Sequence, residues 1–372
     1  MSRDLLSTPR RVAAAIALTL ALAGCSGAGG PTQTPLPPAP ATSAVTRSPA
    51  PTSTAAPTPT LPPTPVVTAN ATASTAASPT NASIVVTGDD GVTVTLSAPP
   101  QKVISLTPAT SELMFALGAG DRLVGRTDYD DYPPEVTQVP AVATFQGVEM
   151  EKVVNIGPDL VLAGGNGFTP AADIQRMRDL GFAVLVLYAA DVAGVQADIR
   201  LVGQAVDEQR AADQIATTIQ GSIDEVTAAV ANLPKPRTFY EIGNDPELYG
   251  PAPDSFVADM VTLAGGDPIT TTDPAVFAIP LERLVSLDPE VIVLGDAAYG
   301  VCPDQVATRA GWKSMTAVKN GDIRPVDDTI VTRPGPRLGD GLAALALAIH
   351  PDAALAAPVD ATTYCGPSPS PT

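Results

Sequence analysis

The stretch EKVVNIGPDLVLAGG at residues 151–165 returns, with conservative changes, as ERLVSLDPEVIVLGD at residues 282–296. Each copy opens with a glutamate and a base, continues with apolar residues at helical spacing, reaches a proline and an acid, and ends in an apolar run. A helix that stops before proline and is followed by a buried strand is typical of an α/β unit with parallel strands. Because the copies begin 131 residues apart, the sequence predicts two related α/β lobes.

One long helix is predicted between the two halves. Residues 207–233 contain no proline and keep apolar residues three and four apart, which is the period of an amphipathic helix. We also expect a hairpin at residues 84–96 and a helix with a hairpin-like strand at residues 311–327. The expected order is therefore an N-terminal lobe, a connecting helix, a C-terminal lobe and a tail, at residues 84–206, 207–233, 234–351 and 352–372.

The first 83 residues do not fit a globular lobe. Residues 1–25 have a basic start, an apolar stretch too short to span a bilayer, and the ending LAGC, as an export signal has. This ending resembles the lipobox of bacterial lipoproteins, in which the cysteine, here Cys25, receives the lipid anchor; an ordinary secretory signal is the alternative. Residues 26–83 are almost entirely Pro, Thr, Ala and Ser, and we expect a disordered tether.

The net charge bears on the class of binding partner, and the cysteine count bears on a possible disulfide. The chain carries a net charge of −18, and residues 1–83 hold four arginines against one aspartate, so the acidic excess lies in the predicted lobes. Such a surface argues against nucleic acid as a partner. With Cys25 assigned to the anchor, Cys302 and Cys365 remain; in an oxidising compartment they can pair, although sequence alone leaves the pairing open.

The sequence gives little support for a catalytic site or a metal site. The only histidine, His350, ends the last predicted helix, where it can interact with the helix dipole. A Ser–His–Asp arrangement or a zinc site built on histidines is therefore not expected. The GGNG run at residues 164–167 lacks the strand and helix context of a dinucleotide site and is interpreted as a cleft loop. We expect no enzyme, no metal and no cofactor; a hydrolase or a surface sensor on the same scaffold is the non-transport alternative.

Residues 99–350 resemble the substrate-binding proteins of cobalamin and ferric-siderophore ABC importers. The resemblance is carried by KVISLTPATSELMFALG, DYDDYPPEV, FQGVEMEKVVNIGPDLVLA, LAGGDP, PLERLVSLDPEVIVL, GWKSMTAVKNGDI and RPGPRL. It implies two parallel-sheet α/β lobes joined by one long backbone helix, with a ligand in the cleft between them. It further implies an extracytoplasmic, lipid-anchored monomer that delivers its ligand to an ABC permease and its ATPase.

The resemblance also gives the two repeated glutamates a role. In the family, one exposed acid on each lobe docks onto arginines of the permease, and the matching positions are Glu151 and Glu282. An acid in the first turn of a helix also stabilises that helix through its dipole and needs no partner. The occurrence of both acids at equivalent places favours the docking interpretation.

Ligand-binding candidates lie in loops that follow the predicted strands, where α/β sheets bind ligands. They are Tyr129, Phe145, Gln146, Gly147, Tyr249, Phe277, Tyr299 and Arg333. Arg333 and Arg337 can each meet an anionic group or pair with a nearby acid, and pairing is favoured for Arg337. The motifs favour cobalamin or another corrinoid as ligand, with a ferric siderophore second and haem third, although Phe145 stands where cobalamin binders have a tryptophan. A haem iron would take Tyr129 or Tyr249 as its axial ligand.

Overall fold

The computed structural model describes residues 83–358 and 362–365, all of which fall in one compact unit, residues 75–372. The predicted signal, the tether and Cys25 lie outside the described residues. Within the described part of the chain, no helix is both long enough and apolar enough to cross a bilayer.

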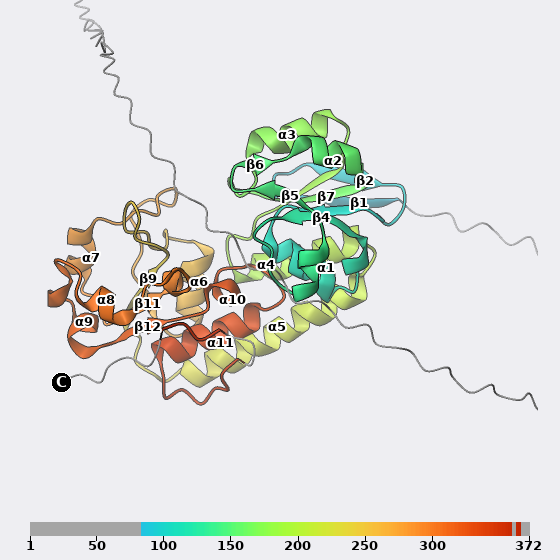
Figure 1. Cartoon of the computed structure of the whole chain (residues 1–372). Helices are drawn as coiled ribbons and strands as arrows, with labels where there is room; N and C mark the ends of the chain where they lie inside the picture. Colours follow the sequence, from blue (N-terminus) through green and yellow to red (C-terminus); the bar gives the residue numbers. More distant parts are fainter. Residues whose placement is uncertain (1–82, 359–361, 366–372) are drawn as a thin grey trace, which may run out of the picture. The chain divides into compact units, whose positions relative to one another are not determined.

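A six-stranded sheet forms the centre of the N-terminal lobe (Figure 1). Its strand order is β6-β5-β4-β3-β7-β8. All neighbouring strands are parallel except β5 and β6. Every residue of β3, β7 and β8 is buried, as expected for a parallel sheet covered on both faces. The strands are β3 (Val103–Ser105), β4 (Leu123–Thr127), β5 (Ala141–Thr144), β6 (Gly147–Val148), β7 (Leu160–Gly164) and β8 (Val184–Leu187).

Helices and a hairpin surround this sheet. Thr107 caps the first helix by accepting a hydrogen bond from the Thr110 N–H, and Pro108 follows it at the first helical position, where proline fits best. The hairpin contacts α4 and β8. These elements are β1 (Ile84–Thr87), β2 (Thr93–Leu96), α1 (Pro108–Ala116), η1 (Gly120–Arg122), η2 (Pro134–Gln138), α2 (Met150–Ile156), α3 (Ala171–Asp179) and α4 (Val192–Ala205).

The C-terminal lobe has a smaller sheet of four parallel strands, in the order β10-β9-β11-β12. The strand predicted as hairpin-like is β12, and that prediction was wrong, because β12 pairs parallel with β11. The strands are β9 (Arg237–Glu241), β10 (Asp267–Pro268), β11 (Val291–Leu294) and β12 (Ile323–Pro325). The helices are α6 (Phe256–Leu263), α7 (Leu281–Leu287), η3 (Gly295–Tyr299), α8 (Pro303–Ala307), η4 (Trp312–Ser314), α9 (Thr316–Asn320), α10 (Asp328–Val331) and α11 (Leu338–Ile349).

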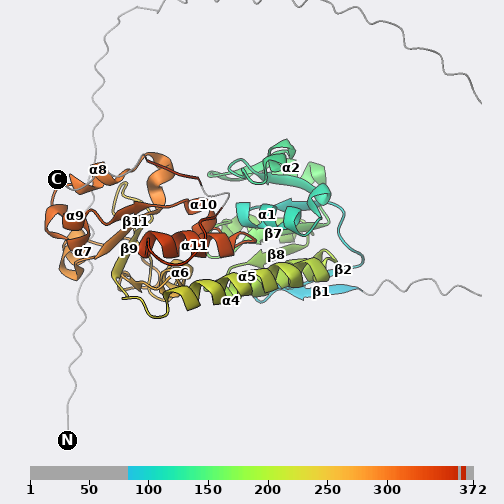
Figure 2. The same cartoon turned by 90° about the horizontal axis from the view of Figure 1, so that it is seen from below.

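The long helix α5 (Gln209–Val230) connects the lobes, as predicted (Figure 2). Its 22 residues span about 33 Å at 1.5 Å per residue. One apolar stripe, from Ala212 to Val230, is buried, and the helix packs against α4 of the N-terminal lobe and against α6 and α11 of the C-terminal lobe. Two parallel-sheet lobes joined by one helix are thus the architecture of the chain.

The repeated stretch builds the same unit in both lobes. The helices α2 and α7 end in left-handed residues, Gly157 and Asp288. The acid after the following proline then ties the next strand to the first parallel strand of its lobe. Asp159 accepts hydrogen bonds from the Gln101 and Lys102 N–H groups at 2.8 and 2.9 Å, and Glu290 accepts one from the Arg237 N–H at 3.0 Å.

Candidate functional site

Aromatic side chains gather where the parallel strands of the N-terminal lobe end. Tyr129 follows β4 and Phe145 follows β5, and their rings stack with centroids 4.5 Å apart and an interplanar angle of 19°. The Phe145 side chain is 86% exposed. An exposed stacked pair of this kind offers a flat apolar surface to a ligand.

The loop around this pair is held by its own polar contacts. Gln146 is exposed, and its N–H donates to the Thr144 hydroxyl at 3.1 Å. Gly147 has φ 123°, and a Cβ there would lie 3.1 Å from an Asp173 carboxylate oxygen. That same oxygen accepts a hydrogen bond from the Val148 N–H. The backbone conformation at position 147 therefore favours glycine, and a Cβ there would also crowd the Asp173 carboxylate.

A buried acid fixes the loop that carries Tyr129. Asp130 is only 3% exposed and accepts hydrogen bonds from the Ser111 and Thr127 hydroxyls. Burial raises the pKa of this carboxyl group despite those donors. Burial likewise raises the pKa of the neighbouring Tyr129 phenol.

Two further aromatics in the same lobe were not identified from the sequence. Phe168 follows β7 and is 71% exposed, and Tyr188 follows β8 and is 37% exposed. The Asn166 amide donates to the Tyr188 hydroxyl at 2.9 Å and links the two loops. Each ring comes shortly after a fully apolar strand, and this signal would have identified both.

The predicted aromatics of the C-terminal lobe lie in separate loops. Tyr249 is half-buried and bridges to Gly243 and Ala278, while the Gly250 N–H donates to the Phe277 carbonyl oxygen. Phe277 is 40% exposed. Tyr299 ends η3 and is 86% exposed. The structure records no ring contact among these three, nor between them and the stacked pair, within the described residues.

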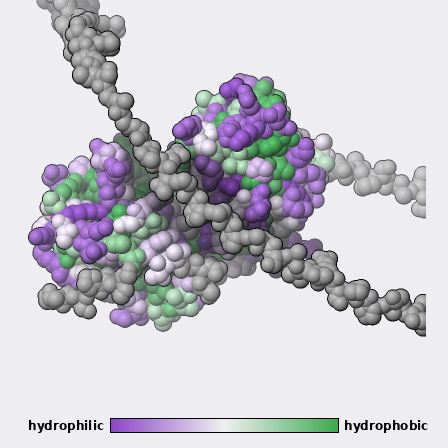
Figure 3. All heavy atoms as spheres, viewed as in Figure 1, coloured by the Kyte–Doolittle hydropathy of each residue, from purple (hydrophilic) through white to green (hydrophobic). Residues whose placement is uncertain are grey.

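The two arginines of the RPGPR motif contact the opposite lobe. The Arg337 guanidinium donates to both carboxylate oxygens of Glu112 on α1, at 2.9 and 2.6 Å, and lies 3.9 Å above the Tyr132 ring. Arg333 donates to Glu112 at 3.0 Å and to both oxygens of Asp131, at 2.6 and 3.2 Å. Arg337 therefore pairs with an acid, as favoured, and Arg333, a ligand candidate, is engaged by two. Figure 3 shows hydrophilic residues gathered where the lobes meet.

These contacts keep both arginines in their charged form. Burial by itself lowers the pKa of Arg333, but the hydrogen bonds and charges of Asp131 and Glu112 outweigh it and raise the pKa above its usual value. Both guanidinium groups thus stay charged, and each has at least one carboxylate partner.

A second polar cluster lies at the strand ends of the C-terminal lobe. Glu241 at the end of β9 is fully buried and pairs with Arg309 at 2.7 Å. The Asn244 amide donates to Glu241 and to Asp296, which follows β11. Burial, and next the charge of Glu241, raise the pKa of Asp296 to about 7.

Cys302 and Cys365 form a disulfide that attaches the tail to the C-terminal lobe. The bond lies three residues beyond the exposed Tyr299, and the Thr362 N–H donates to Asp327 at 2.8 Å. The tail thus braces the segment that presents this aromatic ring. His350 ends α11 and its Nε2 lies 3.1 Å from the Gly265 carbonyl oxygen.

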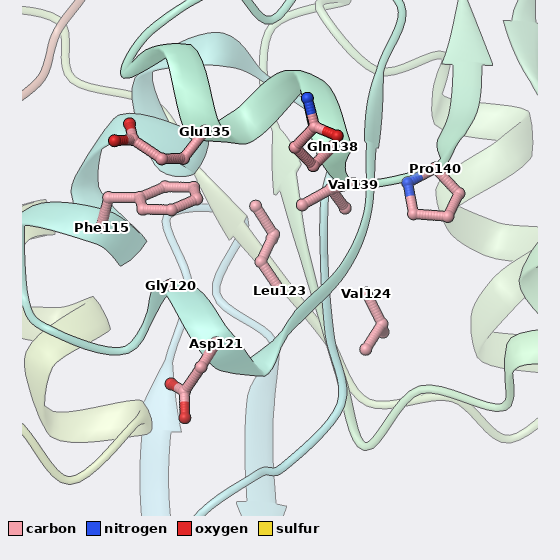
Figure 4. A pocket seen from close by; sticks show the side chains of 9 residues that line it. All are labelled: Phe115, Gly120, Asp121, Leu123, Val124, Glu135, Gln138, Val139 and Pro140. Carbon is pink, nitrogen blue, oxygen red and sulfur yellow. The ribbon is translucent and has the colours of Figure 1, made fainter. Parts of the chain in front are cut away.

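A surface hollow of the N-terminal lobe lies away from these loops. It measures about 520 Å³ and is lined by Phe115, Gly120, Asp121, Leu123, Val124, Glu135, Gln138, Val139 and Pro140 (Figure 4). Leu123 and Val124 begin β4, whereas Tyr129 follows the end of that strand. The hollow therefore belongs to the opposite edge of the sheet and is not the predicted ligand site.

Glu151 and Glu282 are exposed and occupy the first turns of α2 and α7. Each is the second residue of its helix, so the repeat places the two carboxylates equivalently on their lobes. The neighbouring Glu149, in contrast, forms a surface pair with Lys152 at 2.7 Å.

The model of a known family matches this arrangement over most of the folded part. Residues 103–329 match the family described as "Periplasmic binding protein". The chain belongs to the periplasmic binding protein family.

Individual relatives of this periplasmic binding protein agree with the assignment. The uncharacterized ABC transporter substrate-binding lipoprotein YvrC of Bacillus subtilis is 34% identical over 264 residues, which cover 70% of this chain and 83% of the relative. A vitamin B12-binding protein of Pectobacterium carotovorum is 27% identical over 243 residues, 64% of this chain and 84% of the relative. A periplasmic haem binding protein of Pseudomonas aeruginosa shares the fold with a TM-score of 0.61 at 24% identity, over 72% of this chain and all of that one.

Membership in this family determines the general function. The periplasmic binding protein is the substrate-binding component of an ABC transporter, so it binds a small ligand, works with a permease and is not an enzyme. In the described residues, no group of three or more His, Cys, Asp or Glu side chains is placed to hold a metal ion.

Proposed function

We propose that this periplasmic binding protein captures cobalamin or a related corrinoid between its lobes and delivers it to an ABC importer. The main support is the set of exposed rings at the strand ends, above all the Tyr129–Phe145 stack. Such rings suit a large ligand with an apolar face and few charges. The vitamin B12-binding relative adds support for a corrinoid.

Haem and ferric siderophores are the second candidates. A tyrosine that binds haem iron acts as a phenolate, so it must lose its proton. Burial, the largest cause, raises the pKa of Tyr129, and this opposes that loss. Tyr249 is half-buried within its bridged loop. The raised pKa of Tyr129 favours a corrinoid, whose cobalt needs no ligand from these residues.

The ligand-binding residues are proposed to be the predicted set together with Phe168 and Tyr188. We retain Tyr129, Phe145, Gln146 and Gly147 from the N-terminal lobe, Tyr249, Phe277 and Tyr299 from the C-terminal lobe, and Arg333 from the segment before α11. Glu151 and Glu282 are proposed to dock onto the permease, and Cys25 to carry the lipid anchor of a monomeric protein.

Calorimetric titration of the purified chain tests the ligand. We expect cyanocobalamin to bind with a dissociation constant of about 1 μM or tighter, roughly −8 kcal/mol. Phe145→Ala should weaken this affinity by about tenfold, because it removes one exposed ring of the stacked pair. Val154→Ala, which trims an exposed side chain on α2, is the matched control and should bind normally. Heat with a ferric chelate or haemin, and none with corrinoids, would replace the corrinoid proposal by the second candidate.

A further inference from the structure

Arg333 is a cation at the proposed site whose charge is already matched. Its guanidinium contacts Glu112 through one nitrogen and Asp131 through two, at 2.6 and 3.2 Å. We propose that Asp131 sets the charge specificity of the ligand site: by pairing with Arg333, it neutralises the guanidinium charge that a bound ligand meets and so disfavours anionic ligands. The inference rests on the proposed function for the location of the site and goes beyond it in naming the residue that selects ligand charge.

The two acids that contact Arg333 differ in exposure. The Glu112 side chain is 2% exposed, and both its oxygens are taken by Arg337. The Asp131 side chain is 59% exposed and has Arg333 as its ion-pair partner. Glu112 is therefore the fixed partner, and Asp131 is the partner that a ligand can reach and displace.

The elements bring this pair to the ligand side of both lobes. Asp131 lies two residues beyond Tyr129, in the loop that Asp130 anchors to α1 and β4 through Ser111 and Thr127. Arg333 lies between α10 and α11. A ligand on the Tyr129–Phe145 stack therefore meets the loop that carries Asp131.

The exchange is unfavourable for an anion. A ligand carboxylate that binds Arg333 must replace the Asp131 carboxylate, so one ion pair is lost for each one gained. Asp131 would then remain unpaired close to a like charge, which is repulsive. A neutral ligand leaves the Arg333–Asp131 pair intact and meets no such cost.

A pair of ligands that differ in a single charge gives the sharpest test. The probes are cyanocobalamin and its monocarboxylic acids, in which one side-chain amide is hydrolysed to a carboxylate; haemin is a third, unrelated anionic probe. Asp131→Asn keeps the shape and the acceptor oxygen but removes the charge. We expect this variant to shift the ratio of dissociation constants toward the anionic probe by about tenfold, or about 1.4 kcal/mol. The gain should shrink at high salt.

Two variants show whether Arg333 carries the effect. Adding Arg333→Gln to Asp131→Asn should abolish the gain, because no free guanidinium remains. Asp128→Asn removes an exposed charge from the same loop, and no hydrogen bond or ion pair of its carboxylate is recorded with Arg333. An equal gain in Asp128→Asn, or no gain in Asp131→Asn, overturns the inference. Failure of cyanocobalamin to bind, with a haemin gain in Asp131→Asn that needs Arg333, would refute the corrinoid proposal and support this inference.

Discussion

At the scale of single residues, Glu112 connects α1 of the N-terminal lobe to the two arginines before α11. It is almost fully buried on α1 and receives three hydrogen bonds from Arg333 and Arg337. Replacing one member of a buried ionic group leaves the other charges without compensation. The stability of the molecule should therefore depend on this side chain more than on any surface acid.

Glu112→Gln tests that dependence. The amide keeps one acceptor oxygen but removes the charge opposite two guanidinium groups, so we expect the free energy of unfolding to fall by about 3 kcal/mol. Chemical denaturation followed by circular dichroism measures the change. Glu149→Gln is the control, because its pair with Lys152 is exposed and should be worth less than about 1 kcal/mol. Equal losses in the two variants would count against the special role of Glu112.

Sequence reasoning reached some of these residues and not others, for a physical reason. Tyr129 was recognised because its ring follows a predicted strand, and Phe145 because it belongs to the FQG motif; both are local signals. Glu112 gave no such signal, because its partners Arg333 and Arg337 lie 221 and 225 residues further along the chain. Pairing across such a distance depends on how the lobes are placed, which the pattern of neighbouring residues does not contain.

At the scale of elements, the hairpin and α4 share a half-buried acid. Asp198 on α4 lies next to Asp89 in the turn between β1 and β2, and burial followed by the charge of Asp89 raises the pKa of Asp198 to about 8. The same turn is tied to the lobe by an ion pair between Asp90 and Arg178 at 2.7 Å. The Tyr188 N–H also donates to Asp89, so this contact touches the ligand side of β8.

The sign of the resulting pH effect follows from proton binding. In the unfolded chain an aspartate titrates near pH 4, so between about pH 4 and pH 8 the native state binds the additional proton at Asp198. Native stability from this group is therefore present at low pH and is lost as pH rises toward 8. Asp198→Asn should flatten this decline and raise the free energy of unfolding at pH 8 by about 1–2 kcal/mol, a value discounted for partial exposure.

Unfolding curves from pH 5 to pH 8.5 measure this effect. Asp213→Asn provides the control, since its pair with Arg200 on α4 is exposed and should leave the pH profile unchanged. A variant profile as steep as that of the unmodified protein would show that Asp198 titrates normally in the native state.

The tail is a second element whose contribution can be measured. The Cys302–Cys365 disulfide joins two residues that are 63 positions apart in the sequence. In the chain-entropy model, a loop of that length contributes about 4 kcal/mol. Cys302→Ser with Cys365→Ser should lower the free energy of unfolding by an amount of this order, measured against the unmodified chain without reductant. Reductant should destabilise the unmodified chain but not the variant; an equal response of both would point to another effect of the reductant.

Elements with strong periodicity were predicted well, and those fixed by tertiary contacts were not. The repeated helix and strand, the hairpin and α5 all carry their pattern within a few neighbouring residues. The prediction passed over α4, whose sequence is interrupted by Gly194 and Gly203. Gly203 is needed because a Cβ there would lie 2.3 Å from Ala212 of α5. The strand β12 was expected to be hairpin-like but pairs parallel with β11, because three residues of pattern do not reveal the direction in which a strand pairs.

At the scale of the whole molecule, the repeat places one exposed glutamate on each lobe. Glu151 and Glu282 both begin amphipathic helices, and no hydrogen bond or ion pair is recorded for either carboxylate among the described residues. An acid in the first turn stabilises its own helix whether or not the other lobe has one, so helix stability alone does not require acids at equivalent positions. Two acids at equivalent positions also suit a permease with two related halves, which is the proposed docking partner.

Glu151→Ala combined with Glu282→Ala separates docking from ligand binding. We expect the affinity for cyanocobalamin to stay within about twofold, because neither residue lies in the strand-end loops, while uptake of labelled cyanocobalamin falls at least about tenfold. Each single variant should show an intermediate loss of uptake. The uptake rate of the unmodified protein should fall at high salt, because exposed ion pairs mainly govern the rate of association and salt screens them. Asp224→Ala with Glu225→Ala removes the same charge from exposed positions on α5 and should transport normally. Normal uptake by the Glu151/Glu282 double variant would leave the two acids as helix-stabilising residues, because docking that depends on both cannot survive their joint removal.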